Sequence, residues 1–346
     1  MNSAPARILA VCTGGGTGDL LAATPAMRAL RRHLRAPLHV LTSPYGAPIL
    51  EGHPAVDGVL VDDGATPIDE LARRIGGFAF SHAVVFWSTA RVAAIIARAG
   101  IPIRVGQSRR LYSWRYTIRV PVRTETGDKT SHWTDVQMDY ARALGAADEP
   151  ADYRITVPFG PADSAHAAAI IERDAPGGTF VVWHAARGMR LDGVQWPVES
   201  FARIGDALGR EFDAPVLLTG SADEARVVGH IASLMHGRRA SIAGQTSLRE
   251  LAALLSRAAV VVALDSGPMH IAAAVGAPTV GIFGLRTDLP KRWRPLGDHV
   301  AVIEPSFPCP AWHRKENCKT FDCYRALDER VIVAAARSVA GARTPA

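Results

Sequence analysis

The amino-acid sequence predicts an α/β protein built from two Rossmann-like, doubly wound domains that face each other across a cleft. Its 346 residues exceed what one hydrophobic core usually organises. Short apolar runs that are typical of buried strands alternate with helical patterns through both halves. The segment 147–164 between the halves is rich in Pro, Asp and Gly, as expected of a linker. We therefore expect one domain over 1–155 and a second over 156–346.

The first half opens with a predicted βαβ unit. The runs 7–12 and 38–42 are apolar and β-like, and the pattern 22–35 between them is helical. A second helix, 89–100, is expected to end at its glycine, because glycine commonly closes helices. The other elements expected in this half are strands at 58–63, 82–87 and 102–106, a loop at 121–129 and a helix at 131–145.

The second half repeats this alternation after the linker. Its apolar runs are continuous, which is typical of parallel strands that are buried on both faces. The predicted strands are 179–185, 214–220, 259–265 and 277–284, and the predicted helices follow Trp196, Asp223, Ser247 and Pro268. One further option is that a C-terminal helix packs back on the N-terminal domain.

Composition indicates an ordinary globular chain. Apolar residues make up 48% of the sequence and charged residues 21%, which excludes disordered and fibrous classes. No window approaches the ~18 apolar residues that span a bilayer, so we expect a cytoplasmic protein. Four cysteines are too few for a disulfide scaffold of this size.

A glycine-rich turn, GGGTGDLLAATPA (14–26), is expected where the first strand meets the first helix. Glycines let the backbone approach a ligand closely, and the N–H groups at a helix start attract anions. The spacing is neither the G-x-G-x-x-G of NAD-binding proteins nor a P-loop, and a tight βα turn without a ligand remains the alternative. The turn delivers one carboxylate, Asp19, which is either a functional acid or a cap that the helix dipole favours.

A richer motif is ALDSGPMHIAAAVGAPTVGIFG (263–284), which combines a strand, a turn, a helix and a second strand. The turn 265–268 (Asp-Ser-Gly-Pro) precedes a helix that carries His270. A strand-to-helix turn of small residues forms an anion site of diphosphate size from backbone N–H groups. Capping would explain Asp265 or Ser266 alone, but the combination favours a ligand site.

These motifs resemble those of glycosyltransferase family 9, the ADP-heptose-dependent lipopolysaccharide heptosyltransferases. Residues 265–284 match nearly all of the family signature D-S/T-G-P-x-H-x-A-A-A-x-G-x-P-T-V-x-x-F-G. The stretches 18–32, 53–63, 104–110 and 246–268 are also similar to family motifs, so the resemblance covers almost the whole chain. It implies a fold of the GT-B type, with an acceptor-binding N-terminal domain and a nucleotide-sugar-binding C-terminal domain.

The resemblance also implies an inverting, metal-independent transfer, in which an acceptor hydroxyl attacks the anomeric carbon and the nucleotide diphosphate leaves. Asp19 matches the catalytic base of the family, and a carboxylate suits this task because it can take the proton during the attack. Ser266, Gly267 and His270 match the diphosphate-binding turn. Asp265 matches an acid that faces the cleft, where it can also contact the transferred sugar.

Further donor-binding residues follow from the same resemblance. Glu224 matches an acid that accepts hydrogen bonds from the ribose hydroxyls, although a solvent-facing helix glutamate is the alternative. The W-P pair at 196–197 matches a family pair that a phosphate-binding lysine precedes by two residues, whereas this chain has Val194 there. Because the departing diphosphate needs a cation, we expect Arg187 or Arg190 to replace that lysine.

The stretch 91–123 contains eight arginines and no Asp or Glu, which predicts a basic surface for phosphate-bearing partners. Tyrosines and a tryptophan alternate with arginines in its second half; aromatic rings stack on sugars, and arginines pair with phosphates. We expect Gly18, Arg109, Arg110 and Arg115 to bind a phosphorylated glycolipid acceptor, or this surface to contact a membrane. Solvated surface charge is the alternative, and nucleic acid is disfavoured because no nucleic-acid-binding motif accompanies the arginines.

Three cysteines cluster near the C-terminus as Cys309, Cys318 and Cys323, with His313 between the first two. The pattern lacks the paired C-x2-C spacing of zinc sites. We expect these cysteines to belong to a structural loop, either reduced or joined in a disulfide, and keep a zinc site as the alternative.

The resemblance therefore implies an enzyme that moves heptose from ADP-heptose to the lipopolysaccharide inner core, without a cofactor, with peripheral contact at the inner face of the inner membrane as an option. This chain departs from the family at two places: Val194 replaces the lysine, and FGLRTD (283–288) stands where the family often has F-G-P-T-D. Both departures bear on the identity of the donor more than on the type of reaction. The alternatives are another nucleotide sugar, a natural-product or protein acceptor, and an inactive nucleotide-sugar-binding protein.

Overall fold

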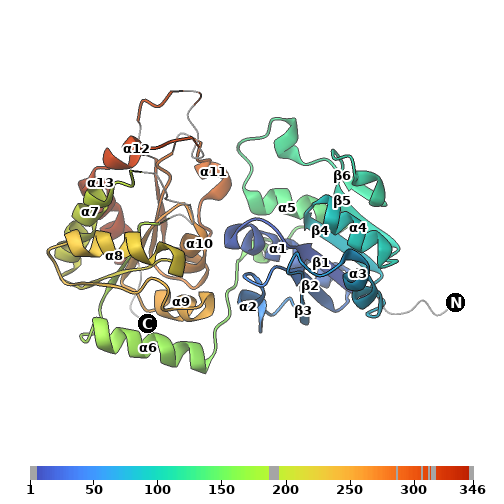
Figure 1. The fold of residues 1–346 in the computed structure, drawn as a ribbon, viewed down its shortest axis with the longest axis horizontal. Helices are drawn as coiled ribbons and strands as arrows, with labels where there is room; N and C mark the ends of the chain where they lie inside the picture. Colours follow the sequence, from blue (N-terminus) through green and yellow to red (C-terminus); the bar gives the residue numbers. More distant parts are fainter. Residues whose placement is uncertain are drawn as a thin grey trace. The chain divides into compact units, whose positions relative to one another are not determined.

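The computed structural model describes residues 6–186, 195–285, 287–304, 307–310, 312 and 317–342. The chain divides into two compact units, Met1–Pro158 and Phe159–Ala346. Each unit has a six-stranded parallel sheet with helices packed around it (Figure 1). The prediction of a doubly wound α/β fold is thus confirmed, and the division falls inside the predicted linker 147–164.

The sheet of the first unit has the strand order β3-β2-β1-β4-β5-β6. Helices α3 and α4 share a hydrophobic core with β1 and β4, while α1 packs against α5. The strands are β1 Ile8–Cys12, β2 Leu38–Thr42, β3 Gly58–Val61, β4 His82–Trp87, β5 Ile103–Gln107 and β6 Ile118–Val120. The α-helices are α1 Thr17–Leu34, α2 Ala47–Leu50, α3 Ile68–Gly76, α4 Ala90–Arg98 and α5 Trp133–Arg142, and short 3-10 helices are η1 Ser113–Arg115, η2 Arg123–Thr126 and η3 Pro150–Tyr153.

The sheet of the second unit has the equivalent order, β12-β11-β10-β7-β8-β9. Its strands are β7 Val181–His184, β8 Val216–Leu218, β9 Arg239–Ser241, β10 Val260–Leu264, β11 Thr279–Ile282 and β12 Val300–Ile303. Its helices are α6 Pro161–Asp174, α7 Val198–Phe212, η4 Ala222–Glu224, α8 Ala225–Leu234, α9 Leu248–Leu255, α10 Gly267–Ala274, α11 Pro290–Trp293, α12 Asp322–Arg325 and α13 Glu329–Gly341. In both units the central strands are fully buried, as their uninterrupted apolar sequences require.

Helix α1 begins at Thr17, five residues before the predicted start at 22. The glycine turn itself starts the helix, because Gly16 is the N-cap and Asp19 closes a capping box. Pro25 lies inside the helix and cannot donate to the carbonyl of Leu21. The hydroxyl of Thr24 donates to that carbonyl instead, at 2.7 Å, so the proline leaves no buried acceptor unsatisfied.

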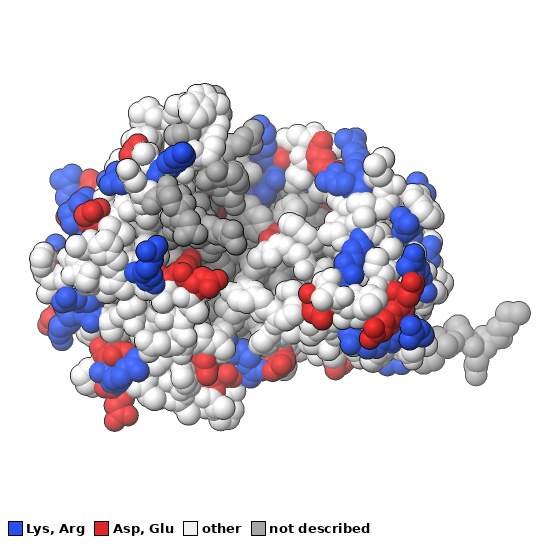
Figure 2. Space-filling model, in the orientation of Figure 1, with Lys and Arg blue, Asp and Glu red and all other residues white. Residues whose placement is uncertain are grey.

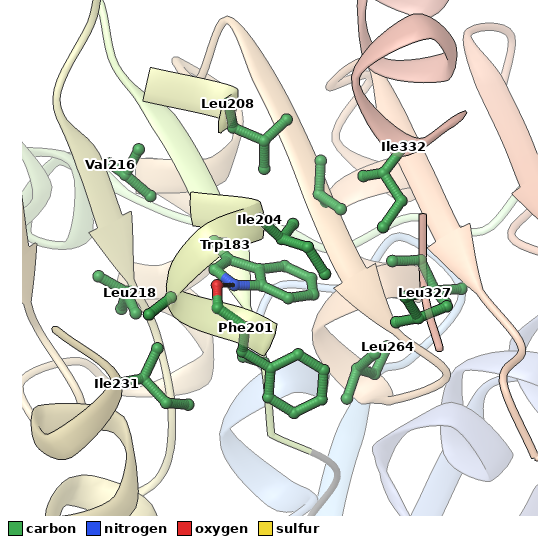
Figure 3. Packing of buried hydrophobic residues seen from close by; sticks show 14 of the residues in the cluster. Trp183, Phe201, Ile204, Leu208, Val216, Leu218, Ile231, Leu264, Leu327 and Ile332 are labelled. Carbon is green, nitrogen blue, oxygen red and sulfur yellow. Dashed lines mark hydrogen bonds between the residues drawn. The ribbon is translucent and has the colours of Figure 1, made fainter. Parts of the chain in front are cut away.

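The core of the second unit forms around Trp183 of β7 and Phe201 of α7 (Figure 3). The indole Nε1 of Trp183 donates to the carbonyl of Phe201 at 3.0 Å, so the largest buried side chain has its polar atom satisfied. Helix α13 packs on β10, β11 and β12 through the buried stripe Ile332, Ala336 and Val339. The C-terminal helix is therefore part of the core of the second unit.

Helices long and apolar enough to cross a membrane are absent from the described residues.

Candidate active site

In each sheet the chain first adds strands from the centre toward one edge. It then returns to the centre and adds the remaining strands toward the other edge. This change of direction lies between β1 and β4 in the first unit and between β7 and β10 in the second. Ligands of open α/β sheets bind at the carboxyl ends of the strands at such points. Each described candidate residue follows the carboxyl end of a strand, β1 or β5 in the first unit and β8 or β10 in the second.

Two glycines of the first turn, Gly14 and Gly15, lie so close to neighbouring side chains that a Cβ would collide with them. A Cβ on Gly14 would lie 2.0 Å from the indole Nε1 of Trp87, at the end of β4. Gly15 has φ +77°, and a Cβ there would lie 2.6 Å from Oδ2 of Asp19. The turn after β1 thus packs closely on both β4 and its own carboxylate, because it lacks side chains.

Asp19 is half-buried in the first turn of α1, next to half-buried Gly18. Its Oδ2 atom accepts a hydrogen bond from the backbone N–H of Gly16 at 2.9 Å, which is the capping geometry. A carboxylate has two oxygens and can accept several hydrogen bonds, so this cap fixes the orientation of Asp19 and still leaves it able to act as a base. Burial, followed by the charge of Asp19, raises the pKa of the nearby Cys12 thiol, which stays protonated.

Beside this turn, a hydroxyl network joins β4 to the segment after β5. The phenol of Tyr112 donates to the carbonyl of Ser88 at 2.8 Å and accepts from the amide of Gln107 at 3.0 Å. The phenol of Tyr116 is hydrogen-bonded to the hydroxyl of Ser88. Burial raises the pKa of Tyr116 to about 12, so it remains a neutral phenol. These residues hold the β5–β6 connection against the carboxyl end of β4.

The stretch 91–123 is less basic than its sequence predicts. Four of its eight arginines pair with acids from outside it: Arg91 with Asp62, Arg98 with Asp69, Arg110 with Glu125 and Arg123 with Asp135 and Asp139. Glu125 follows the stretch almost directly, whereas Asp62, Asp69, Asp135 and Asp139 lie farther from it in the sequence, where the composition of the stretch does not reveal them. On the visible face in Figure 2, positive and negative side chains likewise lie near each other.

The three predicted acceptor arginines have different surroundings. Arg109 is exposed, and the guanidinium of Arg115 lies 4.3 Å from the ring centre of Trp114. Neither has a carboxylate partner among the residues that the structure describes. Arg110 instead reaches Oε1 of Glu125 at 2.5 Å. Its charge is partly compensated, so Arg109 and Arg115 are the better candidates for an anionic ligand.

In the second unit, the turn 265–268 links fully buried β10 to α10. The hydroxyl of Ser266, the N-cap of α10, donates to the carbonyl of Leu264 at 2.8 Å, and Asp265 and Gly267 are half-buried. His270 is buried, with its ring 6.3 Å from that of Trp293. The N–H groups in the first turn of α10 form the kind of site that attracts a phosphate.

Glu224 is buried, so the solvent-facing alternative for this residue is wrong. Its Oε2 atom accepts from the N–H of Ser221 at 2.8 Å and from the hydroxyl of Ser221 at 3.0 Å. These bonds form a capping box that holds the carboxylate at the carboxyl end of β8.

His184 is a residue that the sequence interpretation missed. It lies at the end of β7, between the strands that lead to Glu224 and Asp265, and its Nδ1 atom is 2.9 Å from the hydroxyl of Thr219. Burial lowers the pKa of His184, while the charge of Glu224 acts in the opposite direction. A neutral imidazole therefore lies within electrostatic reach of Glu224. The sequence did offer a signal for His184, because it is a polar residue at the end of an otherwise apolar strand.

Arg187 and Arg190, the predicted phosphate-binding cations, lie outside the described residues.

None of the four cysteines is in a disulfide, so the disulfide option for the C-terminal cluster is wrong. Burial, followed by the nearby thiol of Cys318, raises the pKa of Cys323 to about 12. Within the described part of the chain, no group of three or more His, Cys, Asp or Glu is arranged to hold a metal, and His313 lies outside that part.

Comparison with known proteins gives a family match. Residues 68–323 match the model of "Glycosyltransferase family 9 (heptosyltransferase)". A provisionally named glycosyltransferase of Haemophilus influenzae is 23% identical over 307 residues, which span 84% of this chain and 87% of the relative. The family-model match begins at residue 68, after Asp19, so the role of Asp19 stays a prediction.

Solved structures agree on the fold. The crystal structure of a family 9 glycosyl transferase from Veillonella parvula superimposes with a TM-score of 0.83, at 20% identity and 99% coverage of both chains. The ADP-heptose lipopolysaccharide heptosyltransferase II of E. coli gives a TM-score of 0.78 at 18% identity, with 97% of this chain and 99% of that chain covered.

Proposed function

The chain belongs to glycosyltransferase family 9, and we propose that it transfers a heptose from ADP-heptose to a phosphorylated inner-core acceptor of lipopolysaccharide. The observation that carries the proposal is Asp19, a carboxylate that a backbone N–H holds at the carboxyl end of β1. The named activity of the E. coli neighbour, which has the same fold, supports ADP-heptose as the donor.

The first unit binds the acceptor in this proposal, and Asp19 acts as the base. The acceptor hydroxyl attacks the anomeric carbon and gives its proton to the carboxylate of Asp19. As the new C–O bond forms, the bond to the diphosphate breaks on the opposite face of the sugar, which inverts the anomeric configuration. Cys12 does not compete as a nucleophile, because burial keeps its thiol protonated.

The second unit binds the donor. Glu224 accepts hydrogen bonds from the ribose hydroxyls, and its capping box with Ser221 orients it before the donor arrives. The N–H groups at the start of α10 and the side chain of His270 hold the diphosphate. Asp265 would repel a phosphate, so its partner is a hydroxyl of the transferred sugar.

The departing ADP gains negative charge, which the protein must stabilise. Val194 cannot provide the cation that the family usually has at this position, so Arg187 or Arg190 takes that role. Arginine suits it, because its planar guanidinium binds two phosphate oxygens at once. With this cation and the N–H groups of α10, the transfer needs no metal ion or other cofactor.

The acceptor is a glycolipid that carries phosphates. Arg109 and Arg115 are the described cations in the 109–115 segment without a carboxylate partner, and they bind these phosphates. Arg110 contributes less, because Glu125 already compensates its charge. Gly18 lies in the first turn of α1 beside Asp19, where the absence of a side chain leaves room for the attacking hydroxyl.

A second candidate is a family 9 enzyme that uses another nucleotide sugar or a natural-product or protein acceptor. Leu285 favours it. The N–H of Leu285 donates to Oδ2 of Asp288 at 3.0 Å, a bond that the proline common in the family cannot make. The turn that follows β11 therefore contains a hydrogen bond that a proline at 285 would remove, and it follows the carboxyl end of the strand next to β10.

Protection against thermal unfolding tests the choice of donor. A ligand that binds only the folded state raises the unfolding temperature, and the rise grows with the logarithm of the ligand concentration divided by Kd. ADP and ADP-heptose should protect the protein, whereas UDP-glucose, GDP-mannose and dTDP-rhamnose should not. Protection by one of these other nucleotide sugars, without protection by ADP, would favour the second candidate.

A further inference from the structure

We propose that the β5–β6 tip, residues 108–117, docks the protein on an anionic bilayer surface, with Leu111 and Trp114 entering the interface. The proposal goes beyond the sugar-transfer reaction, because it concerns where the enzyme works. It rests on the proposed function only in that a glycolipid acceptor is presented at a membrane surface.

The tip presents two large apolar side chains to solvent. Leu111 is 100% exposed and Trp114 is 65% exposed. Single exposed apolar residues are common and need no explanation, but here two lie three residues apart on one short turn. Neither contributes to the core of the unit, so folding does not account for them. Tryptophan is also enriched at the boundary between lipid and water.

The exposed residues stand on a rigid base. The hydroxyl of Ser113 accepts from the N–H of Arg110 at 3.1 Å and donates to the carbonyl of Gln107 at 2.6 Å. Tyr112 and Tyr116 both hold Ser88 through their phenols. Tyr112, Ser113 and Tyr116 are thus held against the unit, whereas Leu111 and Trp114 are exposed. A fixed turn loses little conformational freedom on docking.

Arginines flank the exposed pair in the sequence. Arg109 and Arg115, both within the tip, lack a carboxylate partner within the described ranges, and the segment 104–119 contains no acid. The guanidinium of Arg115 stacks on the ring of Trp114. Apolar side chains that enter the interface while arginines contact lipid phosphates are the features of proteins that bind anionic membranes. An anionic bilayer is therefore the partner whose chemistry fits the tip.

Docking through this tip would bring the candidate acceptor site to the membrane. Ser88, which the tip holds, directly follows Trp87, and Trp87 packs on Gly14 in the turn that carries Asp19. A series of neighbouring residues in the first unit, Ser88, Trp87 and Gly14, therefore connects the tip to the turn that carries Asp19. A glycolipid head group at the bilayer surface would meet this edge of the first sheet.

Vesicle co-sedimentation tests the proposal, with the full-length protein and no donor or acceptor present. The wild type should bind vesicles of mixed phosphatidylcholine and phosphatidylglycerol, and bind phosphatidylcholine alone much less. Leu111→Gln/Trp114→Gln keeps every arginine and should lower the partition coefficient at least about tenfold. Val331→Gln is the matched control, because it removes another exposed apolar side chain, 52% exposed on α13, and should bind like the wild type.

Three outcomes would overturn the proposal. One is wild-type protein that does not bind anionic vesicles at low salt. Another is a Leu111→Gln/Trp114→Gln protein that binds as well as the wild type, which would mean that charge alone attracts the protein. The third is binding only to vesicles that contain a phosphorylated glycolipid, which would limit the tip to the acceptor contacts proposed for Arg109 and Arg115. None of these depends on the sugar donor, so a wrong donor assignment would leave the vesicle result unchanged.

Discussion

The carboxylate of Asp19 and the backbone N–H of Gly16 form a hydrogen bond of 2.9 Å, between Oδ2 and N. The same geometry occurs in the second unit, where Oδ2 of Asp163 accepts from the N–H of Gly160 at 2.7 Å. Both aspartates occupy the third position of a helix with a glycine N-cap. The protein therefore contains two similar caps, and only Asp19 follows the carboxyl end of a central strand at the change of direction in its sheet.

The same substitution at Asp19 and at Asp163 distinguishes a catalytic role from helix capping. Asp19→Asn keeps an oxygen that accepts from Gly16 but removes the base, so turnover should fall by roughly 10²-fold or more with donor affinity within a few-fold of wild type. Asp163→Asn, the matched control, should leave turnover unchanged. Steady-state kinetics and unfolding temperatures of both variants provide the check. Normal turnover in Asp19→Asn would reduce Asp19 to a helix cap.

A glycine substitution tests how closely the turn holds Asp19. Gly15 and Gly52 have φ values of +77° and +75°, and a Cβ would meet Asp19 at the first position but nothing within 4 Å at the second. Alanine at either position should therefore lower the free energy of unfolding by about 1–2 kcal/mol. Only Gly15→Ala should also lower turnover, because its methyl group displaces the carboxylate. Equal turnover in the two stable variants would contradict this role.

Donor binding can be separated from capping in the same way. Glu224 closes a capping box with Ser221, and Glu250 closes one with Ser247 in the same unit. Glutamine at either position keeps a cap oxygen but loses the charge. Glu224→Gln should weaken ADP binding by about tenfold or more, as expected when a charged acceptor for ribose hydroxyls is lost. Calorimetric titration should give wild-type affinity for Glu250→Gln, and equal affinities in all three proteins would contradict the assignment of Glu224.

His53 should make the stability of the protein depend on pH. It is 2% exposed, its Nδ1 atom accepts from the N–H of Ala55 at 3.1 Å, and burial, followed by the charge of Arg28, lowers its pKa from 6.5 to about 4. Between these values the unfolded chain binds a proton that the folded chain does not. Stability should therefore fall as the pH decreases from about 6.5 to 4, by at most about 3–4 kcal/mol.

The variant His53→Asn isolates this contribution, because an asparagine oxygen can accept from the same N–H two residues later. Urea unfolding at pH 7.5 and at pH 5 should show a smaller loss of stability in the variant than in the wild type. An equal loss in the two proteins would assign the pH dependence to other groups, such as His184, whose pKa burial also lowers.

The sequence was sufficient for the fold wherever a signal was long and local. Strands such as β1 and β10 are uninterrupted apolar runs, and the motif 263–284 predicts its strand, turn and helix in the correct order. Three short edge strands were missed. β6 and β9 have three residues each, and β9 (Arg-Ala-Ser) has no apolar pattern. β12, Val300–Ile303, was missed although its four residues are apolar.

Properties that depend on distant partners could not be predicted. The sequence window that made 91–123 look uniformly basic could not include Asp62 or Asp135, which compensate two of its arginines. The relation between His184, Thr219 and Glu224 likewise depends on β7 and β8 being neighbours in the sheet. Local motifs thus identified the individual candidate residues, and the topology determined which of them lie together.

The most direct test of the proposed function is product formation. Wild-type protein, ADP-heptose and a deacylated, phosphorylated inner-core acceptor should be incubated together, with Asp19→Asn in a parallel reaction, and the acceptor analysed by mass spectrometry. The account predicts an acceptor enlarged by one heptosyl residue with release of ADP, and little or no product in the variant. An unchanged acceptor and intact ADP-heptose, from a protein that consumes a different nucleotide sugar, would contradict it.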